Sequence, residues 1–199
     1  NPKGWEVTKI GNHVKVLGGY AFKSTDFREE GFPIIRISNL KGDSIDLTDC
    51  ARVPAELLGK GSRFKLHPGD TLIAMSGATT GKLGCVPNNL DFDLYLNQRV
   101  GAFRVPEECL VHQQYLRSLL GSPFYQQHVW NLAGGAAQPN ISGKQLESAI
   151  IPLPSLDLQQ RFAEIVSSVE EQKAKMKKHL EQLDDLFASL QQRAFRGDL

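Results

Sequence analysis

The C-terminal part of the chain constrains the fold most, because residues 155–196 contain neither glycine nor proline and repeat apolar residues every seven positions. The series taken as heptad position d consists of Phe162, Val169, Met176, Leu183 and Leu190. The companion position a holds Val166, Lys173, Leu180 and Phe187. Eight of these nine positions are apolar, which predicts a coiled coil sustained over four heptads. At a rise of about 1.5 Å per residue, we expect a helix of about 50 Å.

The start of this helix can also be predicted. Asp157 followed three residues later by Gln160 is typical of a capping box. The preceding Pro152-Leu153-Pro154 ends a strand and cannot continue a helix backwards, so we expect two domains, 1–153 and 154–199. One alternative is a single amphipathic helix that lies on the first domain. Its length argues against that alternative, because such a helix would overhang a domain of this size.

The same residues indicate how two such helices would pair. In a parallel pair, Lys173 would face Lys173 in the core. An antiparallel register instead pairs Phe162 with Phe187, Val166 with Leu183, Val169 with Leu180, and Lys173 with Met176. Its flanks bring Glu170 opposite Lys177 and Ile165 opposite Leu186. Each flank contact is worth only some tenths of a kcal/mol, but all of them favour an antiparallel homodimer centred near Met176.

Residues 1–153 differ from the C-terminal part in their residue pattern, which predicts an α+β domain. Short apolar runs between turn signals predict strands at 14–17, 34–38, 44–47, 71–76, 83–86 and 96–105. Helices are expected near 111–120 and 123–132, with Ser122 and Pro123 at the start of the second. A shorter helix is expected to begin at Ser142, before a strand at 149–153. The order is not an alternating βαβ pattern, so the fold class is mixed α+β with a long C-terminal helix.

Composition excludes several classes of protein. Of the 199 residues, 41% are hydrophobic, which is enough for a core and excludes wholesale disorder. We see no signal peptide and no run of about 20 apolar residues, so no membrane association is expected. The three cysteines are widely spaced and predict reduced thiols in a cytoplasmic protein. A net charge of +1 argues against a histone-like partner, although a local patch can still be basic.

The sequence contains none of the catalytic motifs considered below in complete form. The SGATTGK segment at 76–82 resembles a phosphate-binding loop, but only three residues separate its glycines, and Leu83 stands where a magnesium-binding Ser or Thr belongs. We find no GxSxG, HExxH or EF-hand pattern, no Asp/Asn-Pro-Pro-aromatic motif, and no glycine fingerprint for a methyl donor. The sequence therefore predicts a non-catalytic chain with no metal and no cofactor.

The loops of the first domain instead suggest contacts with nucleic acid. Basic side chains there can bind phosphate or guanine, and amide and hydroxyl groups can bind base edges. The basic candidates are Lys23, Arg36, Lys41, Lys82, Arg99 and Lys144. The polar candidates are Ser38, Asn39, Thr79, Thr80, Asn97, Gln98 and Gln138. Taken alone, each of these loops is more often an ordinary turn or solvated surface, whereas together they suggest nucleic-acid contacts.

In this order the motifs resemble the specificity subunits of type I restriction–modification systems, over essentially the whole chain. The resemblance begins at GWEV (4–7), includes GGYAFKS (18–24), PIIRISNL (33–40), PGDTLI (68–73) and NQRV (97–100), and ends at AFRGDL (194–199). Its most specific part is GGAAQPNIS (134–142), followed by IIPLP (150–154). Family members usually carry two recognition domains and two helical regions, whereas this sequence has one of each. It is therefore half a subunit, either natural or excerpted.

The resemblance implies a target-recognition domain that binds one half of a split site in double-stranded DNA, with the helix as a spacer. It also implies partners: modification subunits that carry methyl donor and catalysis, and possibly restriction subunits. Two copies paired through antiparallel helices would then face a palindromic split site. The alternative is a coiled-coil interaction module without a DNA role, and a third option, a free-standing nuclease or methyltransferase, lacks motifs.

Overall fold

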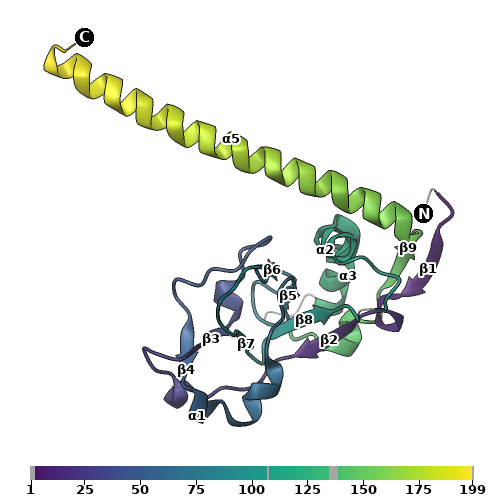
Figure 1. Ribbon diagram of the computed structural model, residues 1–199. Coiled ribbons are helices and arrows are strands. Elements are labelled where there is room, and N and C mark those ends of the chain that lie inside the picture. Colours follow the sequence, from purple (N-terminus) through teal and green to yellow (C-terminus); the bar gives the residue numbers. More distant parts are fainter. Residues whose placement is uncertain (1–2, 107, 135–138, 199) are drawn as a thin grey trace. The chain divides into compact units, whose positions relative to one another are not determined.

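A computed structural model describes residues 3–106, 108–134 and 139–198, and the chain divides into two compact units, Asn1–Leu156 and Asp157–Leu199 (Figure 1). The strands are β1 (Glu6–Lys9), β2 (Lys15–Gly18), β3 (Phe32–Ile35), β4 (Ala51–Val53), β5 (Thr71–Ala74), β6 (Leu83–Cys85), β7 (Tyr95–Leu96), β8 (Val100–Arg104) and β9 (Ile150–Leu153). The helices are α1 (Ala55–Leu58), α2 (Gln113–Gly121), α3 (Pro123–Ala133), α4 (Gly143–Leu146) and α5 (Leu156–Arg196). The predicted α+β class with a long C-terminal helix is confirmed.

Three sheets form in the first unit. Their strand orders are β1-β9, β2-β8-β5-β6 and β4-β3-β7. The four-stranded sheet is antiparallel throughout, whereas β3 pairs with β7 in parallel and with β4 in antiparallel orientation. Pairing of β1 with β9 brings the two ends of this unit together, as the purple and green strands of Figure 1 show.

The central strand β5 is buried on both faces, which its side-chain alternation explains. Successive residues of a strand point to opposite faces. In β5, Ile73 belongs to the core that contains Leu116, Leu120 and Tyr125 from α2 and α3. Leu72 and Ala74 belong to a second core against the β4-β3-β7 side of the unit. All four residues of β5 are therefore buried, and none of them is charged.

Local sequence sets the helix starts. The Ser122 hydroxyl accepts a bond from the Tyr125 N–H at 3.3 Å, and Pro123 occupies the first turn of α3. Ser142 and Gln145 form a capping box at α4, so the predicted short helix begins where expected. The predicted capping box of the long helix is wrong. α5 begins at Leu156, and Asp157 lies inside its first turn, where its carboxylate is 3.2 Å from Arg161 Nε.

Several predicted strands need correction. The strand expected at 34–38 ends at Ile35, because the Asn39 side chain accepts a bond from the Arg36 N–H and bends the chain into a 3-10 turn. The segment at 44–47 is not a strand, since Asp46 bonds both the N–H and the hydroxyl of Thr48 and turns the backbone. The strand expected at 96–105 splits into β7 and β8. No sequence pattern predicted β1, β4 or α1, which are only three or four residues long.

The second unit is the remainder of α5, which has 41 residues and is therefore about 60 Å long rather than 50 Å. Its apolar side chains stay exposed in the single chain, among them Met176, Leu183 and Phe187. Lys173 Nζ lies 2.8 Å from the Glu170 carboxylate on the same helix. Among the described residues, none of the helices is apolar over a length sufficient to cross a bilayer.

Candidate nucleic-acid interface

The loops predicted to contact nucleic acid converge at the C-terminal end of β5. The Met75 N–H donates to the Arg99 carbonyl at 2.9 Å, and the Met75 carbonyl accepts from the Ile141 N–H at 2.8 Å. The next residue, Ser76, forms a bridge with Asn140, and the Gly77 N–H donates to the Pro139 carbonyl at 3.1 Å. The 77–82 turn, the 97–99 turn and the segment at 139–141 therefore meet at one place.

These loops surround a recess that we call the polar hollow, with a volume of about 700 Å³. Its lining consists of Ser76, Gly77, Ala78, Gln98, Arg99, Pro139 and Asn140. Arg99 is the only charged residue among them. Ser76 is 9% exposed, and its hydroxyl has no hydrogen-bond partner within the described part of the chain. The described lining of the hollow thus offers a ligand one cation and two side-chain amides, whereas the Ser76 hydroxyl oxygen is buried.

Two more predicted loops are tied to the same turn. Tyr20 and Asn97 form a parallel bridge, and the Gln98 N–H donates to the Tyr20 carbonyl at 2.9 Å. The Asn97 N–H donates to the Ile35 carbonyl at 3.1 Å, which brings the neighbouring Arg36 to this region. Gly19 makes this approach possible, because a Cβ there would lie 2.2 Å from the Asn97 carbonyl oxygen.

Most of the predicted side chains are available to a ligand. The exposed ones are Lys23, Ser38, Lys41, Thr79, Lys82, Gln98, Arg99 and Lys144, and those partly buried are Arg36, Thr80 and Asn97. The Thr80 hydroxyl donates to the Gly77 carbonyl at 2.7 Å, so it stabilises the turn as well. Lys41 pairs with Asp46 at 3.4 Å, and the Thr48 hydroxyl and N–H, with a smaller effect of Lys41, lower the pKa of Asp46.

Asn39 was predicted to contact a base edge, but the structure buries its side chain. Its side chain is only 2% exposed, and its amide donates to the carbonyls of Asp46 and Asp49 at 3.0 Å each. Its oxygen accepts from the Arg36 N–H at 2.9 Å. With these bonds made inside the protein, the side chain cannot reach a base edge. Asn39 holds the loop that follows β3.

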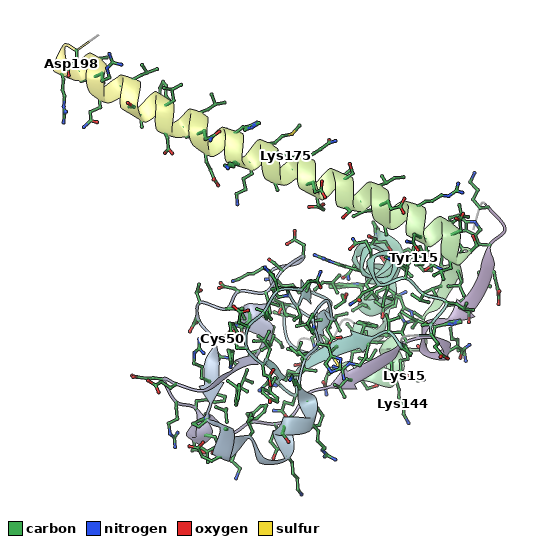
Figure 2. The ribbon with its side chains drawn as sticks, viewed as in Figure 1. Lys15, Cys50, Tyr115, Lys144, Lys175 and Asp198 are labelled. Carbon is green, nitrogen blue, oxygen red and sulfur yellow. The ribbon has the colours of Figure 1, made fainter. Side chains whose placement is uncertain are left out.

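Of the predicted residues that the structure describes, Gln98 and Arg99 line the polar hollow, and the others lie outside its lining. Lys144 projects from α4, which packs on β2, and Figure 2 shows its side chain pointing outward. Gln138 lies outside the described residues. The lining of the hollow also contains Asn140 and Ser76, which were not among the predicted residues. Asn140 stands two residues beyond Gln138 in the same motif, and its amide could have been noted as an adenine-reading group. Nothing in the sequence signalled the unpaired hydroxyl of Ser76.

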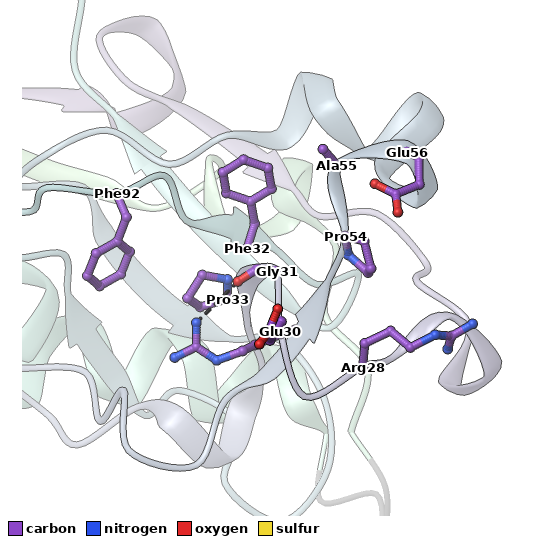
Figure 3. A pocket seen from close by; sticks show the side chains of 10 residues that line it. Arg28, Glu30, Gly31, Phe32, Pro33, Pro54, Ala55, Glu56 and Phe92 are labelled. Carbon is purple, nitrogen blue, oxygen red and sulfur yellow. Dashed lines mark hydrogen bonds between the residues drawn. The ribbon is translucent and has the colours of Figure 1, made fainter.

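A second recess lies elsewhere on the first unit and contains none of the predicted site residues. Figure 3 shows its lining, in which Phe32 and Phe92 lie on one side of Gly31 and Glu56 on the other. Its Arg28 and Arg52 donate to backbone carbonyls, so part of their donor capacity is used within the fold. Among the described residues no group of three His, Cys, Asp or Glu side chains could hold a metal ion. Burial raises the pKa of the Cys50 and Cys85 thiols, which keeps them protonated and unreactive near neutral pH.

Comparison with protein families gives one match over most of the chain. Residues 2–184 match the family described as the type I restriction modification DNA specificity domain. The specificity subunit of type I restriction enzyme MjaVIII from Methanocaldococcus jannaschii is 30% identical over 186 residues, which cover 92% of this chain and 43% of that protein. The EcoKI specificity subunit of Escherichia coli is 25% identical over 98% of this chain and 42% of its own length. The chain thus spans less than half the length of the curated relatives it matches.

Solved structures show the same fold at lower identity. The HsdS subunit from Thermoanaerobacter tengcongensis aligns over 100% of this chain and 46% of its own, with a TM-score of 0.63 and 21% identity. A chain from a structural study of complex assembly and conformational transition in the type I R-M system gives a TM-score of 0.68, also at 21% identity.

Proposed function

The chain belongs to the family of type I restriction modification DNA specificity domains, and from this we propose that it recognises one half of a bipartite site in double-stranded DNA. The observation that carries the proposal is the polar hollow, where the 97–99 turn and the 139–141 segment place Gln98, Arg99 and Asn140 around one recess beside the 77–82 turn. The alternative of an interaction module without a DNA role is not favoured, because the family match covers the domain that bears this recess.

The chemistry of these groups fits a duplex. Arginine can donate two bonds to guanine, and the amides of asparagine and glutamine can pair in the same way with adenine. Lys82, Lys23 and Arg36 lie on the loops joined to the hollow and would contact phosphates, which position the protein without selecting a sequence. Thr79 and Ser38 are exposed on these loops and would make further polar contacts.

The chain is a specificity component of a restriction system, and we propose that catalysis resides in its partners. Modification subunits would carry methyl transfer to adenine, with restriction subunits where the system cleaves DNA. Its relatives bear the names of specificity subunits of restriction enzymes, which supports this division of labour.

We propose further that α5 pairs with a second copy in antiparallel orientation. The support is the apolar row of α5, which extends over its length and is exposed in the single chain. A helix of about 60 Å corresponds to about 18 base pairs at about 3.4 Å each, so it would separate two half-sites by more than one helical turn. A two-fold dimer would therefore bind a palindromic split sequence.

Selection from a randomised duplex library by the full chain tests the DNA proposal. We expect an enriched half-site, and methylation at that sequence in cells that carry the chain with its modification subunit. An Arg99→Ala variant should lose preference at one base pair, whereas Lys60→Ala, an exposed lysine outside the hollow, should keep the same preference. Absence of any enriched sequence, with and without the modification subunit, would refute the proposal.

Disulfide crosslinking tests the helix orientation. In a background without the native cysteines, Val166→Cys and Leu183→Cys are mixed in equal amounts. The antiparallel register predicts a crosslink between the two variants and none within either variant alone. Crosslinking of Val166→Cys to itself would indicate parallel helices and refute the antiparallel dimer.

A further inference from the structure

Trp130 is a large apolar side chain that the folded unit leaves in solvent. It lies on α3 and is 69% exposed, although its neighbour Val129 is 2% exposed and part of the core. Trp130 lines a small recess of about 190 Å³, which we call the apolar hollow. The other lining residues are Gly77, Ala78, Thr80, Gln126, Val129, Ala133 and Pro139. An exposed tryptophan beside a recess is typical of a contact surface rather than of solvated helix.

The position of Trp130 relative to the 77–82 turn is fixed by several contacts. Gln126, one turn earlier on α3, donates from its side-chain amide to the Gly81 carbonyl at 3.2 Å and to the Leu120 carbonyl at 2.8 Å. Gly81 lies against the same helix, because a Cβ there would be 2.9 Å from the Gln126 side-chain oxygen. The indole is therefore held beside the turn that bears Thr79 and Lys82.

The apolar hollow and the polar hollow are neighbours. Gly77, Ala78 and Pro139 line both recesses, so they form a low ridge with Arg99 and Asn140 on one side and Trp130 on the other. Gly77 has a φ of +82°, and nothing lies within 4 Å of where its Cβ would be, so the ridge is open to an approaching ligand. A duplex that places a base or phosphate in the polar hollow would cross this ridge.

We propose that Trp130 is an apolar DNA contact, with its indole packed against the deoxyribose of the nucleotide next to the one bound in the polar hollow. This inference rests on the proposed function. Every nucleotide of a duplex carries the same deoxyribose, so the contact would add affinity rather than base preference. DNA is the favoured occupant because the 77–82 turn, which Gln126 binds at Gly81, carries the exposed Lys82, and Arg99 lines the neighbouring hollow, so both cations would attract a polyanion. A partner protein is the competing occupant.

The test uses the full chain and the duplex pool enriched by the wild type. Trp130→Ala should weaken binding about tenfold by the same factor at every salt concentration, because no charge is removed and the counterion term is unchanged. Trp130→Phe should recover most of the affinity. The matched control is Phe124→Ala, since Phe124 lies on the same helix and is 57% exposed but lines neither hollow. Phe124→Ala should bind as the wild type does.

A second readout does not depend on folding of an alanine variant. Trp5 and Trp130 are the two tryptophans of the chain, so Trp5→Phe leaves Trp130 as the sole indole fluorophore. Adding the enriched duplex should quench or shift its emission. Unchanged emission together with wild-type affinity of Trp130→Ala overturns the inference, as does emission that responds only to the modification subunit. Failure of the wild type to enrich any duplex overturns the proposed function itself, and that outcome is distinct from the others.

Discussion

Replacing Asn39 by alanine should destabilise the first unit rather than alter DNA preference. The side chain makes three hydrogen bonds with the backbone of Arg36, Asp46 and Asp49 at 2.9–3.0 Å, and it is 2% exposed. A buried bond contributes about 1 kcal/mol, and a group left unpaired costs at least as much. The three together predict a loss of about 3 kcal/mol in the free energy of unfolding. For a unit of this size the melting temperature should fall by roughly 6–12 °C.

Urea unfolding followed by tryptophan fluorescence measures this loss. Both tryptophans lie within Asn1–Leu156, so the signal reports this unit and excludes the large helical signal of α5. The neighbouring Ser38 is exposed, and Ser38→Ala should change stability by no more than about 0.5 kcal/mol. If Asn39→Ala unfolded within 1 kcal/mol of the wild type and instead changed the selected DNA sequence, the structural role given to Asn39 would be wrong.

Three further variants test the roles of Gly19, Tyr125 and Lys82. Gly19→Ala should lower the free energy of unfolding by about 2–3 kcal/mol and disturb DNA binding, because its Cβ would overlap the Asn97 carbonyl. Gly18→Ala should be tolerated, because the nearest atom to its Cβ would be 3.9 Å away. Equal urea midpoints for the two variants would contradict this expectation. Burial raises the pKa of Tyr125, so above pH 10 the unfolded chain releases a proton that the folded one keeps. The free energy of unfolding of the wild type should then fall by up to about 1.4 kcal/mol per pH unit relative to that of Tyr125→Phe. If the stabilities of the two proteins changed in parallel up to pH 11, the effect expected of Tyr125 would be wrong. Lys82→Ala should lower the slope of log affinity against log salt by about one, and an unchanged slope would remove Lys82 from the phosphate contacts.

The sequence was most informative where a pattern repeats or a cap is local. The heptads predicted a helix over nearly all of α5, and Ser122 and Ser142 marked the starts of α3 and α4. Prediction failed where side chains redirect the backbone. Asp46 and Asn39 bond neighbouring backbone groups, which the alternation of apolar residues around them does not reveal. Strands as short as β1 and β4 depend on their partners, and a partner such as β9 is distant in sequence.

The candidate site was predicted in part for a similar reason. The loops with Lys82, Gln98 and Arg99 were identified from residue type and turn signals. Their meeting point depends on long-range bonds such as Met75 to Arg99 and Gly77 to Pro139, which no local pattern encodes. Residue type alone therefore selected Asn39, which is buried, and passed over Asn140, which lines the hollow.

The three-residue turn between β7 and β8 has a consequence for how recognition could diversify. β7 belongs to the sheet with β3, and β8 belongs to the sheet with β2 and β5, so Asn97, Gln98 and Arg99 form the joint between two sheets. An inserted residue there would shift one sheet against the other and break the bonds to Ile35 and Tyr20. New specificities should therefore arise at this joint by exchange of side chains at constant length. A change of length in the β5–β6 hairpin would not shift one sheet against the other, but it would disturb the bonds of its tip to Pro139 and Gln126.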